Sequence, residues 1–132
     1  MTEKKTITGY FVDPENCIAG ARTIEHSLEG FYALLRCDCI DMPERRIGGD
    51  DYFTIICDDE GLLKADPVIS AFDSTGTPAL VGPIFVVKFD GEEDVTSITE
   101  EDFILLTKYT RQGLFYKNGN PARQTFLICT DY

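Results

Sequence analysis

The sequence has no tryptophan, a single histidine, His26, and no apolar run that could cross a membrane. Its longest apolar stretch, 79–87, contains Gly82 and Pro83, whereas a membrane-spanning helix needs roughly 20 apolar residues. Residues 1–5 are followed by an alternating stretch and not by the apolar core of a secretory signal. We therefore expect a cytoplasmic protein without a membrane span.

Basic residues are also scarce. Lys and Arg total 12 against 23 Asp and Glu, which gives a formal net charge of −11. This charge disfavours direct binding to nucleic acid or to an anionic membrane surface, and it favours an unidentified protein partner with a basic surface. The five cysteines include no C-x-x-C pair, so free, reduced thiols are expected.

The chain of 132 residues, 43% of them hydrophobic, is long enough for one domain with a hydrophobic core, assigned to 1–132. Helices are predicted from Ser27, which is followed by apolar residues at helical spacing, and from Thr99 to about Tyr109, where Asp102 completes a capping box. Strands are predicted at 6–12, 39–46, 52–57, near 62–63, at 84–89, and in a C-terminal hairpin of 114–117 with 125–130.

Three further expectations concern the placement of these segments. Three prolines predict that 65–83 runs over the surface as a loop, and 84–89, apolar on both faces, is expected in the centre of the sheet. Pro43 lacks an N–H group, which places its strand at an edge or a bulge. The predicted fold is α+β, a mostly antiparallel sheet of five to seven strands with two helices packed on one face.

Catalytic and metal-binding patterns are weak. His26, Cys37 and Cys39 are the only soft metal ligands close together in sequence, and they lack the paired spacing of a zinc site, so Cys37 and Cys39 are expected to be buried free thiols. His26 precedes a helix start, where an exposed, idle histidine is expected. No nucleophile, phosphate-loop or EF-hand motif occurs. We therefore expect no metal and no cofactor, and we favour a non-enzyme.

The acidic residues form four clusters, which are the candidate partner-binding residues. They are Asp50 and Asp51; Asp58, Asp59 and Glu60; Glu92, Glu93 and Asp94; and Glu100 and Glu101. On one face, these carboxylates would imitate a line of phosphates. Each cluster also has a local explanation, as a turn or as the start of a helix.

Several short motifs resemble a family of small uncharacterised proteins, a domain of unknown function from Gram-positive gut bacteria and their plasmids, phages and conjugative elements. The motifs are 27–29, 45–49, 55–62, 79–82 and 97–102. The resemblance covers about 7–108 and leaves the hairpin at 114–130 as an addition. It implies no catalytic residues, and its link to mobile elements implies, by analogy, a host-interaction or antirestriction role.

Three hypotheses follow for the function. The leading one is a non-enzymatic cytosolic binding or accessory protein of a mobile genetic element. The alternatives are an acidic nucleic-acid mimic that inhibits a DNA-processing enzyme of restriction or defence, and an enzyme with a cryptic cysteine or carboxylate site. A binding protein is expected to show an exposed apolar patch or an unpaired strand edge, and the edge near Pro43 is the first place to look.

Overall fold

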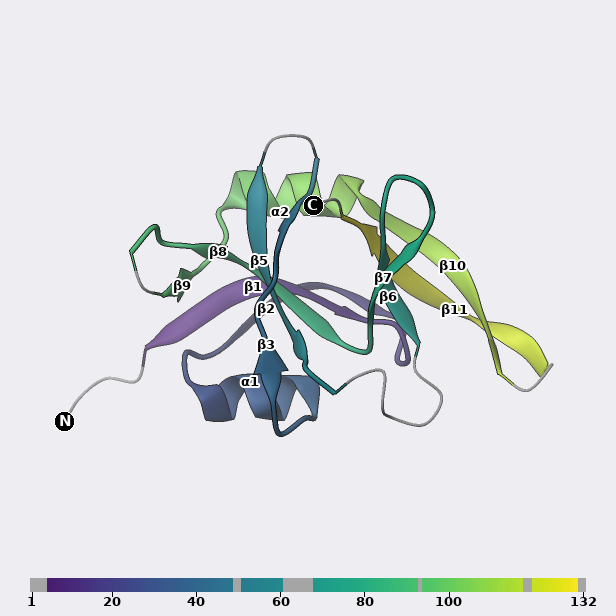
Figure 1. Ribbon diagram of the computed structural model, residues 1–132, viewed down its shortest axis with the longest axis horizontal. Helices are drawn as coiled ribbons and strands as arrows, with labels where there is room; N and C mark the ends of the chain where they lie inside the picture. Colours follow the sequence, from purple (N-terminus) through teal and green to yellow (C-terminus); the bar gives the residue numbers. More distant parts are fainter. Residues whose placement is uncertain (1–4, 49–50, 61–67, 93, 118–119, 131–132) are drawn as a thin grey trace.

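Two sheets and two helices make up the computed structural model, which describes residues 5–48, 51–60, 68–92, 94–117 and 120–130 (Figure 1). The larger sheet consists of β1 (Thr6–Asp13), β2 (Ile18–Glu25), β3 (Ile40–Asp41), β4 (Glu44–Arg46), β5 (Tyr52–Asp58), β8 (Ile84–Phe89) and β9 (Val95–Thr96). The smaller sheet consists of β6 (Ile69–Phe72), β7 (Pro78–Val81), β10 (Thr110–Lys117) and β11 (Asn120–Cys129). The helices are α1 (Leu28–Leu35) and α2 (Glu100–Lys108).

The mostly antiparallel α+β architecture is confirmed, and the larger sheet has seven strands, within the expected range, but a second sheet was not expected. The described residues form a sheet of seven strands, in the order β2-β1-β8-β5-β3 with β4 on β5 and β9 on β8, and a second sheet of four, in the order β10-β11-β6-β7. β8 lies between β1 and β5 with Ile84 to Val87 fully buried. Its central position is as predicted from its two apolar faces.

The two helices lie on opposite faces of the larger sheet, so their expected packing on one face is not confirmed. Neighbouring residues of β8 point to opposite sides: Phe85 packs with Phe31 of α1, and Val86 packs with Leu106 of α2. Figure 1 shows the two helices flanking the strands. Because β8 is apolar on both faces, both faces must be buried. α1 helps to bury one face, and α2 helps to bury the other.

Both helix starts are confirmed. The Ser27 side chain accepts a hydrogen bond from the Gly30 N–H at 3.0 Å, and Thr99 and Asp102 form the reciprocal capping box. These contacts satisfy N–H groups that have no partner within the helix.

Three strands, β2, β6 and β7, lie in segments where no strand was predicted. β2 pairs with β1 along its full length, from Thr6 opposite Glu25 to Asp13 opposite Ile18. The expectation that 65–83 is a surface excursion is wrong for 69–72 and 78–81, which form β6 and β7, with Ser70 and Ala71 buried. The short strand expected near 62–63 lies outside the described residues.

The C-terminal hairpin is confirmed and is longer than predicted. β10 and β11 pair antiparallel from Thr110 opposite Ile128 to Lys117 opposite Asn120. The end of β11 then runs parallel to β6, with Ile128 opposite Ala71. This contact joins segments more than 50 residues apart in sequence, and it explains why β6 is stable as a strand.

Candidate functional site

An open groove of about 270 Å³ lies on the α1 side of the larger sheet. Its lining residues come from the loop between β3 and β4 and from four neighbouring strands or their ends: Met42, Glu44, Thr54, Phe89, Asp94 and Val95. Strand register brings them together, because Glu44 lies opposite Thr54, Thr54 opposite Val87, and Phe89 opposite Val95. Paired residues of antiparallel strands project from the same face.

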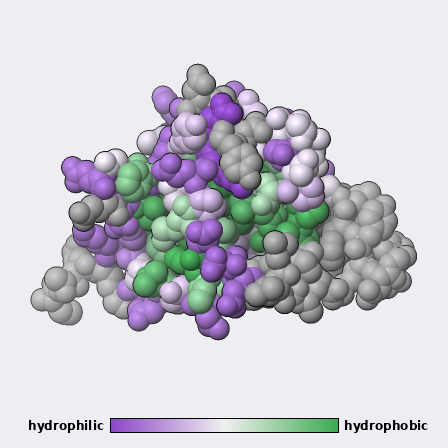
Figure 2. Space-filling model, viewed as in Figure 1, coloured by the Kyte–Doolittle hydropathy of each residue, from purple (hydrophilic) through white to green (hydrophobic). Residues whose placement is uncertain are grey.

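The groove has an apolar floor and two exposed apolar side chains. Val95 is buried in the apolar cluster that α1 covers, and Thr54 is buried on β5. Met42 and Phe89 are 39% and 46% exposed, so the groove presents two large apolar side chains to solvent. Figure 2 shows hydrophobic residues gathered over the centre of one face of the molecule, bordered by hydrophilic residues.

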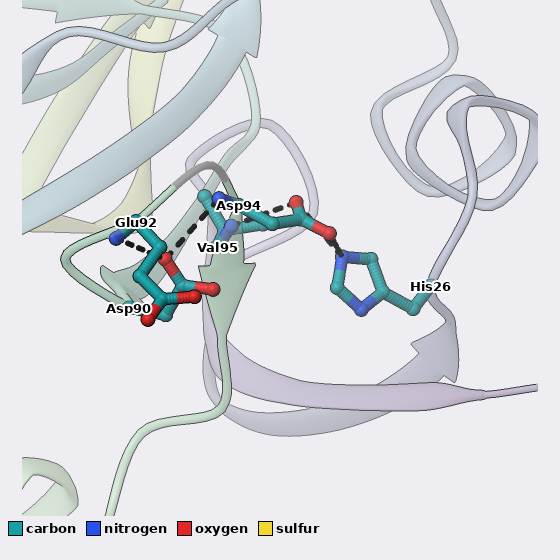
Figure 3. Close-up of polar contacts among 5 residues, drawn as sticks. All are labelled: His26, Asp90, Glu92, Asp94 and Val95. Carbon is teal, nitrogen blue, oxygen red and sulfur yellow. Dashed lines mark hydrogen bonds and ion pairs between the residues drawn. The ribbon is translucent and has the colours of Figure 1, made fainter.

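The rim of the groove is acidic. Glu44 is exposed on one side and Asp94 on the other. Asp94 belongs to a tightly bonded turn, in which Asp90 Oδ1 accepts the N–H groups of Glu92 and Asp94 at 2.8 and 3.2 Å (Figure 3). Asp94 Oδ1 in turn accepts the Val95 N–H at 2.7 Å, which orients this carboxylate at the groove.

His26 connects this turn to the start of α1. Its Nε2 lies 3.3 Å from both carboxylate oxygens of Asp94, and its side chain is only 17% exposed (Figure 3). The ring also lies 6.0 Å from that of Phe31, centroid to centroid. The expectation of an exposed histidine is therefore wrong: packing of α1 on the sheet brings His26 against the β8–β9 turn.

The four acidic clusters are not brought together into one group. Asp51 precedes β5, whereas Asp58, Asp59 and Glu60 lie at its far end, a separation of about 20 Å along a strand of this length. Glu92 and Asp94 lie in the β8–β9 turn, and Glu100 and Glu101 begin α2 on the other face. In Figure 1 the β8–β9 turn lies at the left and the end of β5 towards the bottom, whereas the start of β5 and α2 both lie at the top. Asp50 and Glu93 lie outside the described residues.

The cysteines are free thiols among the described residues, in different environments. Cys37 is buried as expected, but Cys39 is exposed, so the expectation for Cys39 is wrong. Burial, followed by the nearby charge of Asp41, raises the pKa of Cys57 from 9.0 to about 12. At neutral pH this thiol is therefore protonated and a poor nucleophile.

No cluster of three or more histidine, cysteine or acidic side chains suited to a metal ion occurs among the described residues. Within the same residues, the His26 ring forms its polar contacts with Asp94, and none joins it to a cysteine.

Sequence reasoning identified Asp94 and the Pro43 edge, but it missed Met42, Glu44, Thr54 and Phe89 as parts of one site. Aligning 40–46 with 52–58 as an antiparallel hairpin places the side chains at 42, 44 and 46 on the same face as those at 52, 54 and 56. This alignment could have grouped Met42, Glu44 and Thr54.

None of the helices in the described part of the chain is long and apolar enough to cross a membrane. No curated protein and no solved structure matches the chain. A family model does match, over residues 7–113, which extends the resemblance found in the sequence from 108 into β10. The chain thus belongs to the family described as Domain of unknown function (DUF3846).

Proposed function

We propose that this chain is a non-enzymatic binding protein whose groove holds a segment of a partner protein that carries apolar and basic side chains. One observation carries the proposal: exposed Met42 and Phe89 share a groove with the rim carboxylates of Glu44 and Asp94. An exposed aromatic side chain in a concave site is a typical anchor for a protein partner.

The charge of the chain supports a basic partner. The net charge of −11 attracts a basic segment at long range, and the two rim carboxylates can pair with Lys or Arg at short range. Because the rim is exposed to solvent, each pair contributes to specificity and association rate more than to affinity.

The finer parts of the proposal rest on the sequence, and the link to a mobile element rests on its family resemblance. We place this binding protein in the cytoplasm, as an accessory protein of a mobile genetic element. The alternative of a nucleic-acid mimic receives no support from the described acidic segments, because they lie at opposite ends of β5 and on opposite faces of the larger sheet.

A display library of random peptides tests the proposal. Peptides selected on the wild-type chain should contain apolar residues together with Lys or Arg. Phe89→Ser should weaken their binding about tenfold, the effect of losing one apolar anchor worth about 1.4 kcal/mol. Glu44→Lys should weaken binding most at low salt.

Matched controls come from α2, on the other face of the sheet. Ile104 is 52% exposed, close to the exposure of Phe89, so Ile104→Ser removes a comparable apolar surface outside the groove. Glu101→Lys is the corresponding charge control. Selected peptides that bind all four variants equally, or that depend on Ile104 and not on Phe89, would contradict the proposal.

A further inference from the structure

We infer that the partner segment binds as an extended strand, paired with the outer edge of β3 and β4 beside the groove. This inference rests on the proposed function and specifies the backbone conformation and sequence pattern of the ligand. The edge is the one that the sequence marks with Pro43, and no described strand pairs with its outer side.

The hydrogen bonds of this edge show which backbone groups face outward. Ile55 N–H donates to Pro43 C=O at 2.9 Å, and Asp59 N–H donates to Cys39 C=O at 3.1 Å. Odd-numbered residues of this segment therefore bond to β5, and the backbone groups of the even-numbered residues, Glu44 among them, point away from it.

Proline usually protects a sheet edge because it removes a donor from it. Here the arrangement is reversed, since Pro43 stands at an odd-numbered position and its missing N–H faces β5. The outer row keeps the N–H and C=O of Glu44. The N–H of Met42 donates to Asp41 Oδ1 at 2.9 Å, so at that position the C=O is the group offered to a partner.

The side chains at this edge predict the sequence pattern of the ligand. Met42 and Glu44 are two residues apart, and both line the groove. On an added strand, the residues opposite them also lie two positions apart on the same face, with Cβ atoms about 5 Å from those of Met42 and Glu44. The ligand therefore has an apolar residue opposite Met42 and a Lys or Arg opposite Glu44, with one residue between them.

Other edges also compete for an added strand. β2 ends the larger sheet on its opposite side, and β7 and β10 are the outer strands of the smaller sheet. β2 carries exposed Ala21, Arg22 and Thr23 but no large exposed apolar side chain. The edge of β3 and β4 is favoured because it adjoins the groove, which Met42 and Glu44 line.

Backbone N-methylation of a peptide selected on the groove tests this inference. A methyl group on an N–H that points toward β3 and β4 removes one hydrogen bond and adds a steric clash, and binding should weaken about fivefold or more. A methyl group at the residues between should have little effect. The expected result is an alternating pattern of sensitive and tolerant positions.

Amide hydrogen exchange of the protein gives an independent readout. Peptide binding should slow exchange of the Glu44 N–H, which faces outward, and leave that of Arg45, which faces β5, nearly unchanged. A peptide that requires Phe89 but shows no alternation and no protection at Glu44 would overturn strand pairing and leave the proposed function standing. Protection at β2 or β7 would overturn both.

Discussion

Substitution of Gly30, in the first turn of α1, tests the packing of this helix. For Gly30→Ala, helix propensity predicts a gain in stability, whereas packing predicts a loss. In a helix, alanine is preferred to glycine by about 1 kcal/mol, so the sequence alone predicts that Gly30→Ala stabilises the protein. In the structure, a Cβ at this position would lie 2.2 Å from the carbonyl oxygen of Glu25, the last residue of β2.

That oxygen has little freedom to move. Glu25 is paired with Thr6 in the sheet, and its C=O accepts the Ser27 N–H at 3.0 Å. The start of α1 must shift by about 1 Å, at a cost of 1–3 kcal/mol for overpacking and about 1 kcal/mol if the Ser27 cap is lost. After the gain in helix propensity is subtracted, the free energy of unfolding should fall by about 2 kcal/mol.

Urea unfolding followed by circular dichroism measures this change. Gly20→Ala is the matched control, because a Cβ at Gly20 meets nothing closer than the Arg22 side chain at 3.9 Å. The control should be neutral or slightly stabilising. A Gly30→Ala variant that is more stable than the wild type would refute the packing of α1 against β2, and with it the placement of His26 beside Asp94.

Three further predictions concern stability and thiol chemistry. Thr99→Ala removes one half of the α2 capping box and should cost about 1 kcal/mol in urea unfolding. Because the pKa of Cys57 is raised from 9.0 to about 12, the unfolded chain loses this proton first, and stability should fall between pH 9 and pH 12. The loss should reach about 1 kcal/mol per pH unit and be absent in Cys57→Ala, and an unchanged slope in that variant would contradict it. With a thiol reagent at neutral pH, exposed Cys39 should react quickly and Cys57 only after unfolding.

The elements that were predicted correctly are those that short segments of sequence specify without distant partners. The capping residues of both helices and the doubly apolar pattern of β8 are properties of short segments, and they predicted these elements correctly. The edge position of Pro43 also followed from one residue, because a missing N–H restricts where a strand can lie.

The elements that were missed depend on distant partners. β2 is half-exposed and carries Gly20, so only its pairing with β1 makes it a strand. β6 is flanked by prolines in sequence, and its parallel contact with β11 lies far downstream. The groove was missed for the same reason, because Met42 and Phe89 become neighbours only through the registers of three strand pairs.

Chemical-shift mapping of a display-selected peptide on the ¹⁵N-labelled protein tests the central claim most directly. The account predicts that the perturbed amides cluster at 40–46 and around Thr54, Phe89 and Asp94, and that Phe89→Ser abolishes this pattern while Ile104→Ser preserves it. Perturbations concentrated on α2 or on the edge of β2, with the groove unaffected, would contradict it.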